Sequence, residues 1–446
     1  IQFDNEGGEV FICGNPPYVG DKKQSSQQKS DLENLFSGLT KKWKSLDYVS
    51  GWFIKASNYA NTSEVSFAFV STNSITQGQQ VPILWPLLLN NNLEIYFANT
   101  SFKWTNLASN NAGVIVVIIG IRKASNKEKL IINLDKDDNG SALAVTNISP
   151  YLVPGKTFYV EPRQTPLSSL PEMLLGNFAK DGGHLILDYP DLDNLDEISK
   201  SFIRPMFGGQ EFIKSKQRFC LWIKDDDYQK ACSSSFLKMR FESVRRNRLE
   251  SPKKATREWA EKPYKFVEIR SPNYIQAMVI PIVSSANREY YPVGFLPPDS
   301  IINYAFGLYD APLWTMSIIM SKLHLVWIKT VCGKMKSDYR YSNTLGWNTF
   351  PLPNLTEKNK IDLTESVKNI LISRENYFPM PISELYNPEN MPLDLKNAHI
   401  VNDEILERIY IGRNFKNDTE RLEKLFDLNI KLSQDSKSNS LIIKNK

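Results

Sequence analysis

The sequence predicts an α/β fold for about the first 150 residues, then a mixed α+β module, then a helical carboxyl-terminal region. Strand-like apolar segments alternate with helical segments up to about residue 125, as in sheets with parallel strands. Proline and glycine become frequent between residues 149 and 171, which marks a boundary. A chain of 446 residues is long enough for two or three domains. We therefore expect domains at 1–150, 151–335 and 336–446.

Four strands are expected in the first domain. Val10–Gly14, Val65–Ser71 and Leu93–Ala98 are separated by helical segments, so these three strands should be parallel. Gly113–Ile121 follows after about fourteen residues without a helical pattern, which is too few for a crossover, so it should be antiparallel to its predecessor. A parallel sheet that ends with one reversed strand is typical of the carboxyl-terminal half of a Rossmann-like sheet.

The second domain should contain short strands around one basic helix. The expected strands are 184–189, 218–223, 264–270, 276–283, 290–296 and 301–309, with the helix between the second and the third. A long apolar helix, Leu313–Cys332, should close this domain. Helical spacing continues at Ile361, Val367 and Ile370 and again in Leu395–Tyr410, which predicts the helical third domain.

The tetrapeptide Asn15-Pro16-Pro17-Tyr18 directly follows the first strand, at the edge where open α/β sheets bind ligands. The Asn15 side-chain oxygen and the Pro16 carbonyl can together accept both hydrogens of an exocyclic amino group, which draws the nitrogen lone pair out of conjugation. Two prolines restrict this backbone, and the Tyr18 ring offers a face to a planar base. The chemistry suits methylation of an amino group. A Pro-Pro turn after a core strand is the alternative interpretation.

Aromatic residues near the end of the third strand form a second candidate surface. Phe102 and Trp104 are expected in the loop between the reversed strands, where they would face the Asn15 loop and stack on an extruded base. Edge packing of a hairpin loop explains them equally well. Tyr48 and Trp52 have helical i,i+4 spacing and are expected in the core.

Lys and Arg are concentrated in one segment. Residues 236–270 contain eleven Lys or Arg and five Glu, so the net charge of this segment, +6, exceeds the net charge of the whole chain, +5. Such a helix end and loop suit contacts with DNA phosphates, and a solvated helix face is the usual alternative. The candidate DNA-binding residues here are Arg245, Arg246, Arg248, Lys253, Lys254 and Arg257.

Cysteine and histidine are scarce. The four Cys and three His have no paired spacing, so we predict no metal site and no disulfide framework. Cys13 and Cys220 lie in apolar contexts that suit buried thiols in a reducing compartment. No signal peptide and no apolar run of membrane length is visible, so we expect a cytoplasmic protein without a membrane partner.

Several blocks of the sequence resemble one family of enzymes. The tetrapeptide Asn15–Tyr18 resembles the catalytic motif of amino-group DNA methyltransferases, which have class I methyltransferase sheets. Over nearly the whole chain, the ordered blocks resemble the MmeI-like group of combined restriction and modification enzymes. These blocks are Gly14–Gly20, Phe69–Gly78, Phe102–Trp104, Pro171–Met173, Asp181–His184, Phe202–Pro205, Ser337–Thr344 and Met391–His399.

The resemblance implies a function and a set of residues. It implies the second half of an adenine-N6 methyltransferase domain, then a target recognition domain, with S-adenosylmethionine as cofactor and double-stranded DNA as partner. Asn15, Pro16, Pro17 and Tyr18 would be catalytic. Base reading would lie around Ser284, Ser285, Asn287 and Arg288, although the family often has a charged residue near Ala286, and this chain does not.

The cofactor site is expected to be incomplete. Only about nine residues precede the first strand, and no G-x-G occurs in a strand-to-helix setting. We expect the glycine-rich turn, the ribose-binding acid and commonly a nuclease domain in an upstream part of the same polypeptide. The chain alone would then bind S-adenosylmethionine weakly or not at all and would be inactive. It shows no PD…ExK constellation, so cleavage is not predicted.

Two other functions stay open. One is a DNA-specificity module without catalysis, against which the intact Asn15–Tyr18 motif argues. The other is a protein-glutamine methyltransferase, because the same motif serves enzymes that methylate a side-chain amide. That function would need neither the basic segment nor a recognition domain of some 180 residues.

Overall fold

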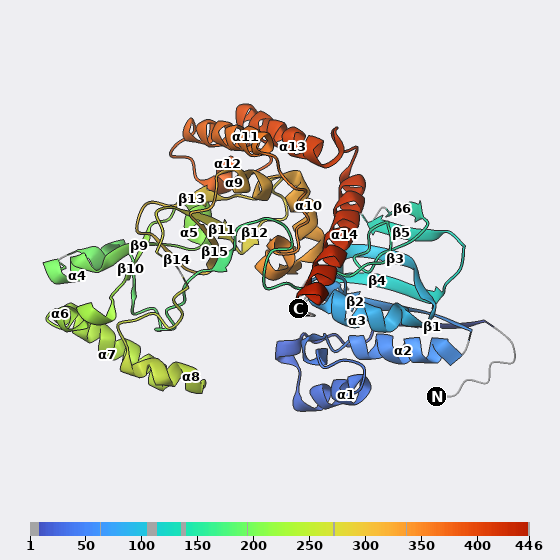
Figure 1. Cartoon of the computed structure of the whole chain (residues 1–446). Coiled ribbons are helices and arrows are strands. Elements are labelled where there is room, and N and C mark those ends of the chain that lie inside the picture. Colours follow the sequence, from blue (N-terminus) through green and yellow to red (C-terminus); the bar gives the residue numbers. More distant parts are fainter. Residues whose placement is uncertain are drawn as a thin grey trace. The chain divides into compact units, whose positions relative to one another are not determined.

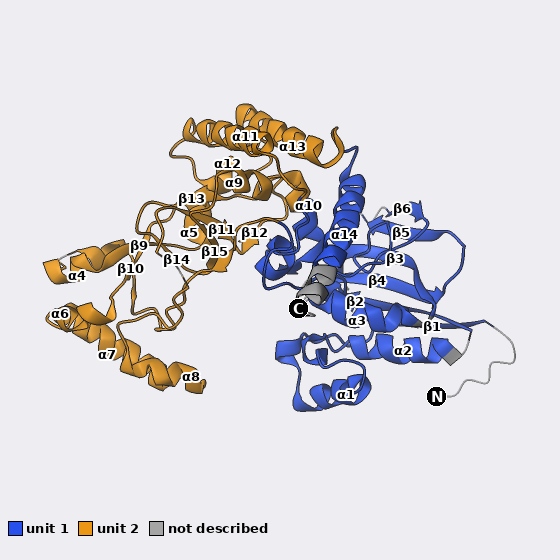
Figure 2. Cartoon of the chain, in the orientation of Figure 1, with its two compact units in different colours: residues 1–168, 326–352, 415–446 blue, residues 169–325, 353–414 orange. Residues whose placement is uncertain are grey.

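The computed structural model describes residues 9–62, 64–104, 114–134, 140–193, 195–270, 273–335 and 337–444. The chain forms two compact units, each assembled from separate segments (Figure 2). Unit 1 contains residues 1–168, 326–352 and 415–446, and unit 2 contains residues 169–325 and 353–414. Among the helices in the described ranges, none has the length and apolar character needed to cross a membrane.

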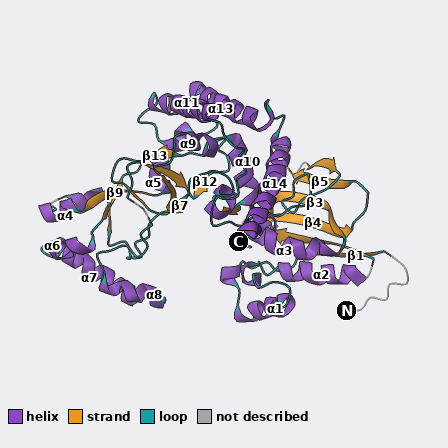
Figure 3. Cartoon of the chain, viewed as in Figure 1, coloured by secondary structure: helices purple, strands orange, loops and turns teal. Residues whose placement is uncertain are grey.

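Unit 1 is built on a six-stranded sheet with the strand order β1-β2-β4-β3-β5-β6 (Figure 3). Its strands are β1 (Val10–Gly14), β2 (Val65–Thr72), β3 (Leu93–Trp104), β4 (Val114–Lys123), β5 (Lys129–Leu134) and β6 (Gly140–Val145). β1 and β2 are parallel, and β4 lies antiparallel between β2 and β3, so β1, β2 and β3 share one direction. The predicted α/β fold and the directions of its first four strands are confirmed.

Three helices accompany the sheet, namely α1 (Ser26–Phe36), α2 (Ser50–Thr62) and α3 (Gln80–Leu88) (Figure 1). Helix α1 begins with a capping box, in which Ser25 and Gln28 satisfy each other's main-chain N–H groups. Phe53 of α2 is completely buried, and its ring centroid lies 5.3 Å from that of Phe69 and 6.4 Å from that of Trp85. These aromatic contacts join α2 to β2 and α3 and fix the helices that follow the β1 loop.

Later parts of the chain complete unit 1. They include the hairpin of β16 (Gly333–Met335) and β17 (Asp338–Arg340) and the helix α14 (Asp418–Lys444). Phe426 of α14 packs with its ring centroid 3.9 Å from Phe158 and 5.7 Å from Trp327. Asn429 donates to the Thr349 carbonyl at 2.6 Å. Segments far apart in sequence therefore share one core in this unit.

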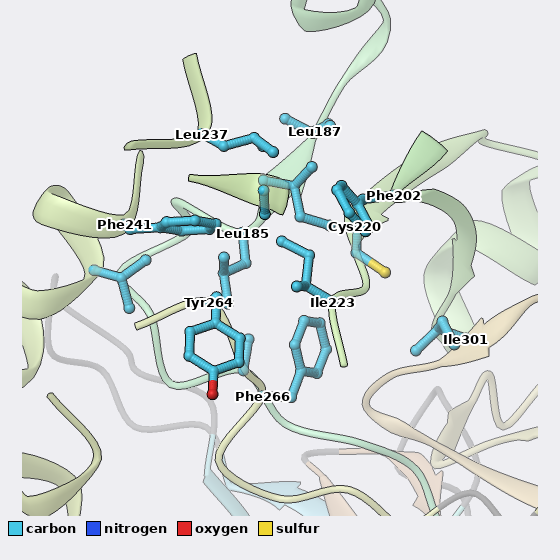
Figure 4. Packing of buried hydrophobic residues seen from close by; sticks show 14 of the residues in the cluster. Leu185, Leu187, Phe202, Cys220, Ile223, Leu237, Phe241, Tyr264, Phe266 and Ile301 are labelled. Carbon is cyan, nitrogen blue, oxygen red and sulfur yellow. The ribbon is translucent and has the colours of Figure 1, made fainter. Parts of the chain in front are cut away.

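Unit 2 contains two four-stranded sheets, β14-β9-β10-β8 and β13-β11-β15-β7. Their strands are β7 (Leu174–Leu175), β8 (Ile186–Leu187), β9 (Ile203–Phe207), β10 (Arg218–Leu221), β11 (Ala277–Pro281), β13 (Gly294–Phe295), β14 (Ile301–Ile302) and β15 (Ala305–Tyr309). The short strand β12 (Val283–Ser284) belongs to neither of these two sheets. Leu187 and Cys220 of the first sheet pack with Leu237 and Phe241 of α7 (Ser235–Leu249) in one hydrophobic cluster (Figure 4). This cluster supports the basic helix.

The remaining helices of the chain are short in the middle and long towards the end. They are α4 (Glu197–Ser201), α5 (Gly209–Lys214), α6 (Tyr228–Ala231), α8 (Lys254–Arg257), α9 (Trp314–Ile319), α10 (Lys322–Val331), α11 (Glu357–Glu375), α12 (Ile382–Leu385) and α13 (Leu393–Ile411). Helix α11 begins at a Thr356 capping box, and α13 ends at Gly412, whose φ of +76° suits glycine.

Several predicted elements differ from the observed ones. The helix expected at Leu313–Cys332 is divided into α9 and α10, because Ser321 Oγ accepts the His324 N–H at 3.1 Å and Asp403 accepts the Lys322 N–H at 2.7 Å, which starts a new helix. The strand expected at 264–270 is not formed; Glu268 makes an isolated bridge with Phe178. Cys13, expected to be buried, is exposed on β1.

Candidate active site and DNA-binding surfaces

The Asn15-Pro16-Pro17-Tyr18 loop leaves the sheet at the carboxyl end of β1. Gly14, the last residue of β1, is in register with Phe69 of β2, so the loop begins beside a strand that continues for three more residues. Asn15 is exposed, Pro16 is buried and Tyr18 is half-buried. Asn15 is thus presented to solvent at the carboxyl end of β1, next to the buried Pro16.

Hydrogen bonds hold the end of this loop. The Val19 N–H donates to Asp47 Oδ1 at 2.9 Å, and the Val19 carbonyl accepts the Tyr48 N–H at 3.0 Å. Gln24 Nε2 donates to the Val19 carbonyl at 3.0 Å and to the Leu46 carbonyl at 2.9 Å. Both the N–H and the carbonyl of Val19 are therefore hydrogen-bonded, which restricts the position of the loop.

Asp47 is the centre of this support. Its carboxylate is buried and also accepts the Val49 N–H at 3.2 Å, and its own N–H donates to Gln80 Oε1 at 3.0 Å. Burial raises the pKa of Asp47, against hydrogen bonds from main-chain N–H groups that favour the carboxylate. Asp47 and Gln24 could not be predicted from the sequence, because their partners lie on other segments and no local motif marks them.

Phe102 and Trp104 lie on β3, not in a loop. The strand continues to Trp104 because Phe102 and Trp104 pair with Val116 and Val114 of β4. Val116 also pairs with Thr72 of β2, so Phe102 is level with the end of β2 at two strand spacings, roughly 10 Å. The two half-buried rings have centroids 6.2 Å apart. The structure thus brings Phe102 and Trp104 to the same edge of the sheet as the Asn15 loop.

Tyr48 and Trp52 do not form part of the core as predicted. Both are half-buried, with ring centroids 5.1 Å apart, and they line a surface cavity of about 460 Å³ together with Asp31. The Tyr48 hydroxyl donates to Asp31 Oδ2 at 2.7 Å, which lowers the pKa of Asp31 and raises the pKa of Tyr48. Trp52 lies on α2, whereas Tyr48 lies in the turn before this helix, so the two residues do not share a helical face.

The basic segment of unit 2 places most of its cations on the surface. Of the candidate DNA-binding residues in this segment, Arg245, Arg246, Lys253, Lys254 and Arg257 are exposed. Two of them make long ion pairs with neighbouring acids, Arg245 with Glu261 at 3.7 Å and Lys254 with Glu258 at 3.9 Å. Exposed pairs of this kind contribute little to stability. The cations therefore stay accessible to an anionic partner.

Arg248 differs from its neighbours. Its side chain is completely buried, and its guanidinium donates to five main-chain carbonyls at 2.7–3.0 Å, those of Ala179, Lys180, Trp259, Lys262 and Lys265. Burial lowers the pKa of Arg248 to about 10. The prediction that Arg248 binds DNA is wrong, because its donors are used inside the protein. The same bonds hold the irregular segment that was expected to be a strand at 264–270.

The segment Ser284–Arg288 forms a turn in unit 2. Ser284 is buried, Ser285 is half-buried and Asn287 is exposed. The Arg288 N–H donates to the Ser285 carbonyl at 3.3 Å, and Arg288 Nη1 donates to Ser284 Oγ at 3.1 Å. Asn287 is thus presented at the tip of the turn.

Two buried tyrosines anchor this turn. The Tyr291 hydroxyl donates to the Pro281 carbonyl at 2.7 Å, and the Tyr290 hydroxyl donates to Asp403 Oδ2 of α13 at 3.1 Å. Next to the turn, Glu289 pairs with Lys396 at 3.1 Å. The turn is therefore held by helix α13 within unit 2, a contact that no local sequence pattern indicates.

Behind Tyr290 lies a buried polar network. The ring of His399 stacks on Tyr290 with centroids 4.1 Å apart, and its Nε2 lies 2.9 Å from the Tyr386 hydroxyl. Burial lowers the pKa of His399 to about 3 and raises the pKa of Asp403 to about 7. Within the described ranges, no group of three or more His, Cys, Asp or Glu could hold a metal ion.

Family models match nearly the whole chain. The model of the MmeI DNA-methyltransferase domain matches residues 2–133, that of the MmeI target recognition domain matches residues 154–354, and that of the MmeI C-terminal domain matches residues 355–436. The match to the methyltransferase domain includes the Asn15–Tyr18 loop, and the match to the target recognition domain includes the basic segment and the Ser284–Arg288 turn.

Two known proteins are similar over most of the chain. DNA methyltransferase A of Bacillus subtilis (strain 168) is 41% identical over 425 residues, which are 94% of this chain and 47% of that protein. A solved structure of the type IIL restriction-modification enzyme MmeI in complex with DNA is 36% identical and has a TM-score of 0.90, covering 95% of this chain and 57% of that one. The chain thus spans about half the length of these proteins.

Proposed function

The chain belongs to the MmeI family of restriction-modification enzymes, with its methyltransferase, target recognition and C-terminal domains, and from this we propose that it supplies the adenine-binding and DNA-recognition residues for methylation of adenine N6 in a specific duplex DNA sequence. The observation that carries the proposal is the placement of Asn15 and Pro16 directly after β1, at the carboxyl ends of the parallel strands β1 and β2. Ligands of open α/β sheets bind at this edge.

The proposed chemistry uses two acceptors on one loop. Asn15 Oδ1 and the Pro16 carbonyl accept the two N6 hydrogens of a flipped adenine, which directs the nitrogen lone pair away from the ring. Tyr18 stacks on one face of the base, and Phe102 and Trp104 form the further aromatic wall at this edge. Pro17 restricts the loop between the acceptors and the tyrosine.

S-adenosylmethionine is the methyl donor that the family implies. Within the described residues β1 pairs only with β2, and the sequence contains no G-x-G turn. The residues present therefore do not form a site for the donor, and the proposed steps concern the adenine alone. Asn15 and Pro16 bind and polarise the amine, and Tyr18 orients the ring.

The DNA contacts divide by chemistry. Exposed Arg and Lys side chains bind phosphates and carry no sequence information, which suits Arg245, Arg246, Lys253, Lys254 and Arg257. Side chains on a fixed turn read base edges, which suits Asn287 and Arg288, with Ser285 beside them. Ser284 is buried and supports the turn through its bond to Arg288.

The experiment that tests this function compares Asn15→Ala with the unchanged enzyme on duplex DNA. Loss of one acceptor should reduce turnover roughly 100-fold or more while DNA binding persists. Mass spectrometry of the digested DNA should show N6-methyladenine with the unchanged enzyme. Equal methylation by Asn15→Ala, or a methylated cytosine in place of adenine, contradicts the proposal. Methylation of a protein glutamine would favour the alternative enzyme, and DNA binding without any methylation would favour a specificity module.

A further inference from the structure

A polar cavity of about 290 Å³ lies at the carboxyl edge of the unit 1 sheet. It is lined by Thr76 and Gln77 after β2, Thr100 and Ser101 of β3, Tyr151, Leu152 and Val153, and by Lys329, Thr330 and Lys334. Among the described residues that line the cavity, two are lysines and none is acidic. The charge of this lining suits an anion.

Lys334 is one of the two lysines that line the cavity. It is half-buried in the middle of β16, and burial lowers its pKa, as does the nearby charge of Lys329. The loop after β2 comes close to this strand, since a Cβ atom added to Gly78 would lie 3.7 Å from the Gly333 nitrogen. Gly78 has a φ of +59°, which a glycine adopts without strain. The main chains of the β2 loop and of β16 thus bring Lys334 to the end of the sheet.

Neutral hydrogen-bond donors also line the cavity. Ser101 Oγ accepts a hydrogen bond from Asn73 Nδ2 at 3.5 Å, and this bond leaves the hydroxyl hydrogen of Ser101 available as a donor. The buried Gln77 adds an amide. A lysine, a hydroxyl and an amide are the side chains that proteins use to bind phosphate oxygens of DNA.

The position of the cavity points to a nucleic-acid phosphate. Ser101 immediately precedes Phe102, and Gln77 belongs to the loop after β2, the neighbour of the strand that carries Asn15. A base that rotates out of the duplex moves its own backbone, so the flanking phosphates must be held close to the base pocket.

We propose that this cavity binds one phosphodiester of the DNA strand that carries the target base, with Lys334 as the charged contact and Ser101 and Gln77 as neutral donors. The proposal rests on the proposed function for the identity of the target base. It assigns Lys334 a positioning role in DNA binding, apart from the basic segment of unit 2.

The test combines a protein variant with a change in the DNA. Lys334→Ala and Lys334→Arg are prepared in the active enzyme, with Lys127→Ala as the matched control, since Lys127 is an exposed lysine at the other end of the sheet, in the turn after β4. The probe is duplex DNA carrying the sequence that the enzyme selects from a random pool. Single methylphosphonates neutralise each phosphate in turn.

Lys334→Ala should lower affinity for the unmodified duplex roughly 10-fold and reduce the salt slope by about 1, and Lys334→Arg should restore most of both. One methylphosphonate should weaken binding by the unchanged enzyme and by Lys127→Ala but not by Lys334→Ala. An unchanged salt slope in a folded Lys334→Ala variant overturns the proposal. The proposal is likewise overturned if the unchanged enzyme and Lys334→Ala are equally sensitive to every methylphosphonate. The proposal is also overturned if inorganic phosphate competes with DNA in a way that depends on Lys334, but no single methylphosphonate loses its effect in Lys334→Ala. Because the probe is chosen by binding, this result stands whether or not adenine is the methylated base.

Discussion

The main-chain N–H of Val19 donates to Asp47 Oδ1 at 2.9 Å, which joins the residue after Tyr18 to the turn that begins α2. A buried carboxylate that accepts main-chain N–H groups fixes a loop without touching the substrate. The Asn15 acceptors depend on their position, because a displacement of about 1 Å can cost roughly 100-fold in rate. Asp47 is therefore a positioning residue for the proposed chemistry.

We expect Asp47→Ala to lower the methylation turnover roughly 10- to 100-fold while the affinity for DNA stays within about 2-fold. The Val19 and Val49 N–H groups lose their acceptor, and the Asn15 loop loses its anchor. Steady-state kinetics on the target duplex measure the split between turnover and affinity. Asp21→Ala, a change at an exposed acid in the same region, should leave both unchanged. A weaker DNA affinity with normal turnover would contradict the positioning role.

For Tyr18, the ring and the hydroxyl can be separated. Tyr18→Ala should weaken capture of the flipped base by about 1 to 3 kcal/mol, whereas Tyr18→Phe retains the aromatic face and should behave like the unchanged enzyme. Fluorescence of 2-aminopurine at the target position reports base flipping directly. If Tyr18→Phe lost as much capture as Tyr18→Ala, stacking would not be the contribution of this residue.

Arg248 is expected to govern stability. Arg248→Met removes the donors of five main-chain carbonyls and should lower the free energy of unfolding by roughly 3 to 5 kcal/mol. Arg246→Ala, an exposed neighbour on the same helix, should change stability by less than about 0.5 kcal/mol but reduce the salt slope of DNA binding by about 1. Denaturant unfolding and salt titrations separate the two. Equal stability losses would show that the burial of Arg248 is unimportant.

The strands of unit 1 were predictable because their apolar residues are contiguous and their connections decide their direction. The expected strands Leu93–Ala98 and Gly113–Ile121 correspond to β3 and β4, which pair antiparallel as predicted, although Gly113 itself lies outside the described residues. β6 escaped prediction because its residues are mostly exposed and give no apolar pattern. The break at Ser321 could not be seen in the sequence, since it depends on Asp403, a residue distant along the chain.

The candidate sites show the same limit. The Asn15–Tyr18 loop could be predicted because the residues that suggest its chemistry are adjacent in the sequence. Arg248 looked like its neighbours in the charge run, yet it lies on the inner face of α7, where Phe241 and Val244 are also buried. Helical spacing places Arg248 four residues after Val244, so the apolar stripe of the helix contained the signal.

A pH dependence is expected from Asp403. Burial raises its pKa to about 7, against charges and bonds from Lys322 and Tyr290 that favour the carboxylate, while Glu407 raises it further. The folded state then binds a proton that the unfolded chain has released, so the contribution of Asp403 to stability is largest below about pH 4 and falls as pH rises to about 7. The neighbouring His399 acts in the opposite direction, because its pKa is lowered and its contribution is lost as pH falls below about 6.5.

The comparison that isolates this carboxyl is Asp403→Asn against the unchanged enzyme. The amide can still accept the Lys322 N–H, and it carries no charge at any pH. The stability of the variant relative to the unchanged enzyme should rise between about pH 4 and pH 7 and stay level above that. Melting temperatures across this range measure it. A constant difference at every pH would show that Asp403 does not titrate there.

Sequence recognition is expected to depend on Arg288 and Asn287. Hydrogen bonds of Tyr290 and Tyr291 fix the turn that carries Arg288 and Asn287, and Glu289 forms an ion pair with Lys396. Arg288 therefore lies on a rigid support. An Arg guanidinium bonds a guanine edge through two donors, and each such contact is worth about 1 to 3 kcal/mol of discrimination. Arg288→Ala should therefore relax or change one position of the methylated sequence. Arg245→Ala should instead weaken binding to all sequences and reduce its salt dependence.

Sequencing of methylated sites in DNA exposed to each variant gives the answer. The stability of both variants should be followed as well, because Arg288 Nη1 also bonds Ser284 Oγ at 3.1 Å inside the turn. Ser284→Ala is the matched control, since it removes that internal bond while retaining the guanidinium. If Arg288→Ala and Ser284→Ala both lower methylation without changing the sequence, Arg288 supports the turn and does not read a base. A changed sequence with Arg288→Ala alone assigns the reading to the guanidinium.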